Sequence, residues 1–237
     1  MSKYRYNPKD VISGMGGAVF IAVAVVISPL LWRWYRRWGA GDAEVQRTLP
    51  GDDLVPHPRS ASTRAITIQS PASRVWPWLQ QIGLKRGGWY SYDFLEAMAG
   101  AADFIDGHSA ERVIPELQEL KVADRIWMHA RILPLTVVAL EPERAIVFLT
   151  RVDMQTKAGF ELGDKMPEQY INSSWVFFLD SAGEKTTRLL VRSRLDYTPS
   201  IFNRFAWRVF TDPISFVMER KMLFNIKRLA EAANKAD

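Results

Sequence analysis

An uncharged, apolar run near the N-terminus constrains this chain more than any other feature. Residues 11 to 32 contain no Asp, Glu, Lys or Arg. As an α-helix that rises about 1.5 Å per residue, the run would be about 33 Å long, enough for a bilayer core of about 30 Å. Tyr4 and Tyr6 precede it, and Trp34 and Trp38 follow it, as is typical of membrane interfaces. The sequence predicts a single-pass transmembrane helix in an N-terminal anchor, residues 1–38.

Two other interpretations of this run remain open, a cleaved signal peptide and a buried core helix. A signal peptide needs small residues at a cleavage site soon after the apolar segment, but the segment here ends in LLWRWYRRW. A core helix would not be flanked by so many arginines and tryptophans. Gly14, Ala18 and Ala22 form a row of small residues that is typical of a helix-pairing face, although such residues are also common in membrane spans without pairing.

The distribution of charge bears on orientation and on partners. Three basic residues precede the run and three follow it directly, with Arg47 further on. The positive-inside rule therefore slightly favours a folded domain on the cytoplasmic side. The net charge is +5, and four of these units lie before Thr48. Because the folded part is nearly neutral, it lacks the basic patch that a nucleic-acid interface needs, and we expect no nucleic-acid partner.

The remaining composition excludes several kinds of site. The chain has no cysteine, so disulfides, thiolate nucleophiles and cysteine-ligated metals are excluded. Its histidines, His57, His108 and His129, do not share a metal-ligand spacing. We therefore expect no metal and no other cofactor.

Residues 39–62, rich in glycine and proline, are typical of a linker, and residues 63–237 are predicted to form one folded domain. The domain opens with a β-branched strand at residues 65–68, and Ser70-Pro71 then favours a helix start. A turn with two glycines and three large rings follows, Gly87-Gly88-Trp89-Tyr90-Ser91-Tyr92. Several antiparallel strands are expected between residues 125 and 197, and Asp212-Pro213 predicts the start of a long C-terminal helix.

The opening motif resembles a known superfamily. The residues VWPWL at 75–79, together with Gln81, Gly83, RGGWYSYD at 86–93, Leu95 and Glu96, are similar to a bacterial, membrane-anchored branch of the START-like, helix-grip (SRPBCC) superfamily. That superfamily includes polyketide cyclase/dehydratase and lipid-transport proteins. The resemblance implies an α+β fold, in which a curved antiparallel sheet wraps around the long C-terminal helix and leaves a cavity between them.

The candidate ligand-binding residues come mainly from aromatic and polar positions that could face such a cavity. Large rings in a glycine-containing turn are poorly placed for burial and suit the wall of an apolar ligand site. Asp93 is three residues from Glu96 on a predicted helix, where acid–base chemistry is possible, but helix capping and salt bridges are the commoner roles. Arg192 could bind a carboxylate or lie on a solvated face. The full set is Trp89, Tyr90, Tyr92, Asp93, Trp127, His129, Trp175, Arg192, Met218 and Met222.

Three functions remain open at the level of sequence. The first is a membrane-anchored protein that binds a hydrophobic small molecule or lipid in the helix-grip cavity. The second is a polyketide cyclase/dehydratase-type enzyme acting on a hydrophobic substrate there, which would need a buried acid or base with a shifted pKa. The third is a structural or signalling membrane protein whose cavity is filled by side chains.

Overall fold

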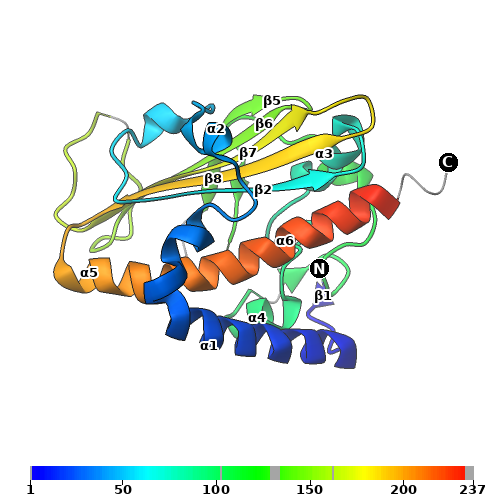
Figure 1. Ribbon diagram of the computed structural model, residues 1–237, viewed down its shortest axis with the longest axis horizontal. Coiled ribbons are helices and arrows are strands. Elements are labelled where there is room, and N and C mark those ends of the chain that lie inside the picture. Colours follow the sequence, from blue (N-terminus) through cyan, green and yellow to red (C-terminus); the bar gives the residue numbers. More distant parts are fainter. Residues whose placement is uncertain (1, 102, 129–133, 162, 233–237) are drawn as a thin grey trace.

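The computed structural model describes residues 2–101, 103–128, 134–161 and 163–232 and has an α+β architecture (Figure 1). Its main sheet is antiparallel, with six strands in the order β2-β8-β7-β6-β5-β4. The strands of this sheet are β2 (Ser60–Ile68), β4 (Arg125–Ile126), β5 (Leu135–Glu141), β6 (Ala145–Asp153), β7 (Tyr170–Ser181) and β8 (Thr187–Tyr197). A second, two-stranded sheet pairs β1 (Ser2–Lys3) with β3 (Asp103–Phe104).

The helices surround this sheet. They are α1 (Pro8–Arg36), α2 (Asp42–Gln46), α3 (Ala72–Gln80), α4 (Asp93–Met98), α5 (Ile201–Ala206) and α6 (Asp212–Ala232), with short 3-10 helices η1 (Asp52–Leu54) and η2 (Pro115–Leu117) and a π-helical segment η3 (Trp207–Thr211). The segments α5, η3 and α6 follow one another without a break. The predicted long C-terminal helix is therefore confirmed, but Asp212 is not its cap, because Asp212 has helical backbone angles and continues the preceding helical segment.

The main core lies between α6 and one face of the sheet. Phe148 and Phe177 project from β6 and β7, and Met222, Leu223 and Ile226 meet them from α6; all five side chains are buried. Alternation along each strand sends every second residue to this face, and the spacing of three and four residues keeps the α6 residues on one side of the helix. The sheet packed on a long C-terminal helix is the helix-grip arrangement that the sequence predicted.

The opposite face of the sheet is covered by the segment predicted as a linker. Leu49 and Val55 are buried there, and Leu49 packs with Val147 and Phe178 of the sheet. The strand β2 begins at Ser60. Residues 39–58 thus form a second layer against the sheet rather than a free connection.

The apolar N-terminal helix is the predicted one, and it packs on the rest of the protein. It begins at Pro8, three residues before the uncharged run, where the side chain of Asn7 accepts a hydrogen bond from Lys9 N (3.0 Å). α1 runs beside α6 and contacts α4 (Figure 1). Its buried residues are Gly14, Gly17, Ala24, Ser28 and Tyr35.

The close approach of α1 depends on small residues. A Cβ on Gly14 would lie 2.5 Å from Cδ1 of Phe94, and one on Gly17 would lie 2.7 Å from Cε1 of Tyr92. Of the row Gly14, Ala18 and Ala22, only Gly14 is buried against the rest of the chain, whereas Ala18 and Ala22 are exposed. The buried residues of α1 follow spacings of three, four and seven residues, which keep them on one side of the helix, whereas a strict four-residue row does not stay on one side.

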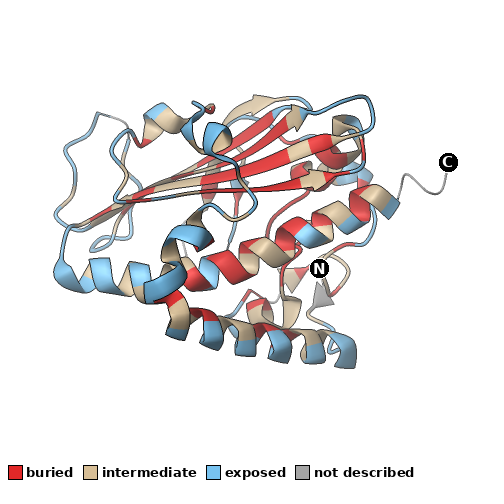
Figure 2. Ribbon diagram, viewed as in Figure 1, coloured by how far each residue is buried: buried red, intermediate tan, exposed pale blue. Residues whose placement is uncertain are grey.

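The other side of α1 is open. Of the 18 residues in its most apolar window, 22% are buried, so α1 is not a core helix. Figure 2 shows the outer side of α1 and most of α5 as exposed. Length and composition make α1 the one helix within the described residues that could cross a membrane.

Candidate functional site

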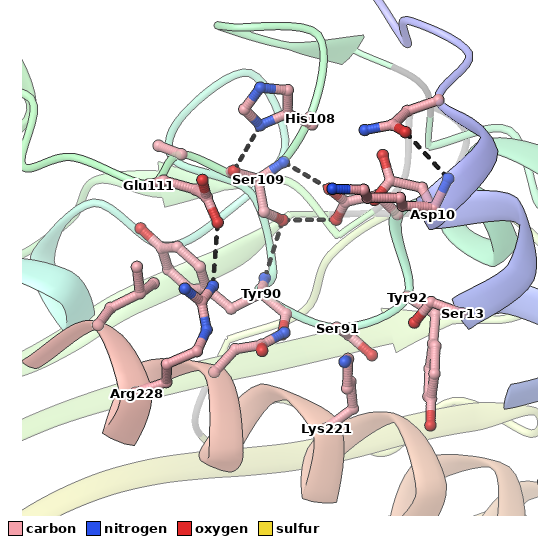
Figure 3. A pocket seen from close by; sticks show the side chains of 16 residues that line it. Asp10, Ser13, Tyr90, Ser91, Tyr92, His108, Ser109, Glu111, Lys221 and Arg228 are labelled. Carbon is pink, nitrogen blue, oxygen red and sulfur yellow. Dashed lines mark hydrogen bonds and ion pairs between the residues drawn. The ribbon is translucent and has the colours of Figure 1, made fainter. Parts of the chain in front are cut away.

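A cavity of about 410 Å³ lies between the start of α1, the loop before α4, residues 108–111 and α6 (Figure 3). The residues of α6 that line it include Lys221, Asn225 and Arg228. Their spacing places them on a different side of α6 from Met222, Leu223 and Ile226, which pack on the sheet. The cavity is therefore outside the sheet–α6 core, on the side of α6 where α1 begins.

The aromatic turn builds one wall of this cavity through an unusual backbone geometry. Tyr90 has φ +56°, in the left-handed region that most side chains avoid. Its hydroxyl accepts a hydrogen bond from Gln81 Nε2 (2.6 Å), and its carbonyl accepts one from Asn225 Nδ2 (2.7 Å). Burial raises the pKa of the Tyr90 hydroxyl. The first bond joins the turn to the end of α3 and the second joins it to α6.

Asp93, the first residue of α4, is fixed by Ser109. Its carboxylate accepts hydrogen bonds of 2.6 Å from both the backbone N–H and the hydroxyl of Ser109. The Ser109 hydroxyl also accepts a bond from Tyr90 N (3.1 Å), and Figure 3 shows Ser109 at the meeting point of these contacts. Burial raises the pKa of Asp93, while the bonds from Ser109 act in the opposite direction. Asp93 is thus a positioned carboxyl group at the cavity wall.

Glu96, one turn further along α4, is a buried acid, whereas Asp93 is partly exposed. Glu96 is 8% exposed, and neither carboxyl oxygen has a hydrogen-bond partner within the described part of the chain. Burial raises the pKa of Glu96 well above its ordinary value, and the nearby Asp93 adds to this. Neither acid fills the expected role of helix cap or salt-bridge partner. α4 begins after Tyr92 without a side-chain cap, and Asp93 bonds to a separate loop.

Basic groups of α6 line the same cavity. Arg228 pairs with Glu111 at 3.1 Å, whereas no carboxylate in the described ranges pairs with Lys221. The Lys221 ammonium lies 5.5 Å from the centre of the Tyr92 ring. A cation over a ring keeps its hydrogen-bonding capacity, so Lys221 can bind an anionic or carbonyl group that enters the cavity.

The structure brings together three of the residues predicted from the sequence. Tyr90, Tyr92 and Asp93 all line the cavity, although the Tyr90 side chain is 1% exposed and also belongs to the main core, contrary to the expectation that this ring is poorly placed for burial. Trp89, Trp175 and Met222 lie instead in or against the main core, where the two indole rings stack with centroids 5.6 Å apart. The resemblance implies a cavity between the sheet and the long helix. At these three described residues the structure has a packed core instead.

Met218 and Trp127 lie outside the cavity. Met218 is half-buried, and its carbonyl accepts a bond from the Ser91 hydroxyl (3.0 Å). Trp127 is 38% exposed beyond the end of β4, and its carbonyl accepts a bond from Leu84 N (2.9 Å). His129 lies outside the described residues.

Arg192 is on the other side of the sheet from this cavity, and it is buried there rather than solvated. It is 4% exposed and pairs with Asp52 at 2.5 Å. It also donates to the carbonyls of Glu44, Val45 and Arg47. Residues 39–58 cover the outward face of β8, so Arg192 anchors that segment and does not line the cavity beside α1.

The sequence reasoning missed Ser109, Lys221 and Asn225. Ser109 lies more than a hundred residues before the other two along the chain, and none of the three belongs to a local motif, so only the tertiary fold places them together. The one available signal was the helical spacing of Lys221 and Asn225 on the side of the long helix away from its apolar stripe.

Comparison with known proteins adds little beyond the fold. No protein-family model matches the chain, and no curated protein matches it. A crystal structure from Mesorhizobium loti is 13% identical, over 73% of this chain and 98% of that one, with a TM-score of 0.39. The di-domain aromatase/cyclase BexL is 14% identical, over 74% of this chain and 47% of that one, with a TM-score of 0.39.

The Zhui aromatase/cyclase from Streptomyces sp. R1128 is 11% identical, over 73% of this chain and 93% of that one, with a TM-score of 0.32. Likeness at this level carries no argument about what this chain binds. The sheet order, α6 and the cavity define the class: an α+β helix-grip protein with an apolar N-terminal helix and a polar cavity beside it.

Proposed function

We propose that this chain is a membrane-associated protein that binds a lipid or another hydrophobic small molecule with a polar head. The observation that carries the proposal is that the cavity opens beside the start of α1. Lys9, Asp10 and Ser13 line the cavity, and the exposed apolar side of the same helix begins at Ile12. A polar site and an apolar surface are thus adjacent on one element.

The lining of the cavity favours the polar part of such a ligand. Its volume lies in the range of small-molecule sites, about 300–1,000 Å³, but most of the lining side chains are polar or charged. Lys221 supplies a cation and Asn225 a further amide donor. The hydrocarbon part of the ligand would remain in the bilayer, because the sheet–α6 interior is already filled at Trp89, Trp175 and Met222.

Membrane association itself is part of the proposal. The sequence predicts a single span with the folded domain on the cytoplasmic side. The apolar, exposed side of α1 supports contact with lipid, since water-exposed helices of soluble proteins carry polar residues on that side.

The test uses the full chain, purified from membranes in mild detergent. Lipid extraction and mass spectrometry should recover a bound lipid or other amphipathic molecule, and uptake of a fluorescent phospholipid should saturate. Lys221→Ala should weaken uptake several-fold, whereas Lys185→Ala, an exposed lysine between β7 and β8, should not. Empty protein and no uptake, or equal uptake by both variants, would refute the proposed site.

A second candidate function rests on the partly buried Asp93 at the cavity wall and the buried Glu96 next to it. Asp93 and Glu96, both with raised pKa, could transfer protons, as a polyketide cyclase/dehydratase-type enzyme would require. In that case Asp93→Asn would abolish turnover of a poly-β-keto thioester while lipid uptake persisted. An unchanged rate in Asp93→Asn, or no turnover by the wild-type chain, would exclude this candidate.

A further inference from the structure

The exposed side of α1 carries no polar side chain along most of its length. Every exposed residue from Ile12 to Leu31 is apolar or glycine. Ile12 is 71% exposed, Val26 77% and Leu30 84%. Monomeric soluble proteins rarely leave an apolar patch of this extent in water. This exposed row of α1 therefore needs an apolar neighbour.

The opposite side of α1 is attached to the domain near both ends. Near the start, Gly14 lies against Phe94. Near the end, the rings of Tyr35 and Phe216 stack with centroids 4.6 Å apart, and Arg36 pairs with Asp212 at 2.8 Å. The carbonyl of Tyr35 also accepts a bond from the buried Arg64 (2.8 Å). Contacts at both ends fix the direction of α1 relative to α6.

This attachment conflicts with a transmembrane orientation. A helix that crosses the bilayer while packed along α6 would bring α6 into the hydrocarbon with it. That helix carries Arg220, Lys221 and Lys227. A single Lys or Arg at the bilayer centre costs about 2.5–3.5 kcal/mol even on the lowest scale. Crossing would therefore require α1 to leave α6 and lose the contacts described above.

The charges at the ends of the row identify the neighbour as lipid. Lys9 is exposed before the row, and Arg33 and Arg37 are exposed after it, with Arg37 in an exposed ion pair with Asp42. Each basic residue near an anionic leaflet contributes about 1 kcal/mol of attraction. A second copy of the chain fits less well, because α1 paired with itself in either direction would bring basic ends together. Anionic headgroups complement both ends at once.

We propose that α1 stays docked on α6 and lies in the plane of an anionic bilayer surface, with its exposed row in the lipid, instead of crossing the bilayer. The inference rests on the proposed membrane association and specifies its geometry. Apolar residues on one side and basic residues at the edges are typical of interfacial helices. The cavity beside Ser13 would then open at the level of the lipid headgroups.

The absence of cysteine permits a direct test by spin labelling. Single cysteines replace Ile12, Val19, Val26 and Leu30 in the full chain, with Lys185→Cys as the water-exposed control. The labelled proteins are reconstituted in vesicles of phosphatidylcholine and phosphatidylglycerol. The depth of each nitroxide is measured from its relative accessibility to oxygen and to a water-soluble nickel complex.

An in-plane helix should place all four labels at one shallow depth, with the Lys185→Cys label in water. A span would place Val19→Cys deepest and the labels at the two ends shallow, because Ile12 and Leu30 are about 27 Å apart along the helix. That profile would overturn the in-plane geometry and leave membrane association standing. If all four labels lie in water, or if their spectra are broadened by spin–spin interaction across a dimer, both the in-plane geometry and the membrane association are overturned.

Discussion

Arg64 Nη1 lies 2.9 Å from Glu219 Oε1, and this ion pair is buried between β2 and α6. The two side chains are 2% and 5% exposed. Glu219 also accepts a hydrogen bond from Trp175 Nε1 (3.2 Å), so a residue from each of three elements meets at one buried carboxylate. The pair joins the edge strand of the sheet to the helix that the sheet surrounds.

Glu219→Leu should lower the free energy of unfolding by about 3–5 kcal/mol, because it leaves the Arg64 guanidinium buried without a counter-charge. Urea unfolding followed by tryptophan fluorescence measures this. Glu119→Leu is the control, since the Glu119 carboxylate is exposed beside Lys121, and exposed pairs contribute about 0–1 kcal/mol. The double replacement Arg64→Met with Glu219→Leu should recover part of the loss. If the free energy of unfolding of the double variant falls by the sum of the decreases in the two single variants, this account is contradicted.

Gly14→Leu should separate α1 from α4. Its side chain would meet the Cβ of Phe94, which lies 2.8 Å from a Cβ built on Gly14 and cannot turn away. Overpacking of this kind costs about 1–3 kcal/mol, so the thermal midpoint in detergent should fall and proteolysis of α1 should accelerate. Gly16→Leu is the matched control, because a Cβ there meets nothing within 4 Å. Equal effects of the two substitutions would show that α1 is not docked as described.

Stability should depend on pH through Glu96. Its ordinary pKa is 4.5, and burial raises the folded-state pKa well above that value. The folded protein therefore holds a proton that the unfolded chain releases, and the resulting stability is present at low pH and lost as the pH rises towards the folded pKa. Each unit of elevation corresponds to about 1.4 kcal/mol.

Glu96→Gln should remove this dependence. Urea unfolding between about pH 5 and pH 8 should show declining stability for the wild type and a flatter profile for the variant. Glu111→Gln serves as control, because the Glu111 carboxylate is exposed. A wild-type profile that rises over this range and is unchanged by Glu96→Gln would show that Glu96 is ionised in the folded protein.

Arg192→Met should release the segment that covers the outer face of the sheet. It removes the pair with Asp52 and the donors to three carbonyls of residues 44–47. Trypsin should then cleave faster after Arg47, while phospholipid uptake stays at the wild-type level. Arg144→Met, at an exposed pair with Glu141, should change neither. Reduced phospholipid uptake by the Arg192→Met variant would instead support the sequence-based prediction that Arg192 binds the ligand.

Local sequence patterns predicted most of the elements of the fold. The long helical pattern after Asp212 forms α6, although helix already precedes it, and the β-branched run at residues 65–68 forms the end of β2. These signals act over a few residues through capping, backbone restriction and side-chain alternation. The candidate site was predicted less well, since Asp93, Ser109 and Lys221 meet only when α4, a loop and α6 are assembled.

The sequence by itself determined that this chain contains one long apolar helix with basic and aromatic ends, because hydropathy and charge are properties of consecutive residues. It also determined a sheet followed by a long helix, because apolar residues recur along the chain with the period of two that is typical of strands and the period of 3.6 that is typical of helices. Only the tertiary structure decided which side of α1 is buried, that residues 39–58 cover Arg192, and that Trp89 and Trp175 fill the space beside α6. These depend on contacts between distant segments, whose geometry no local pattern contains.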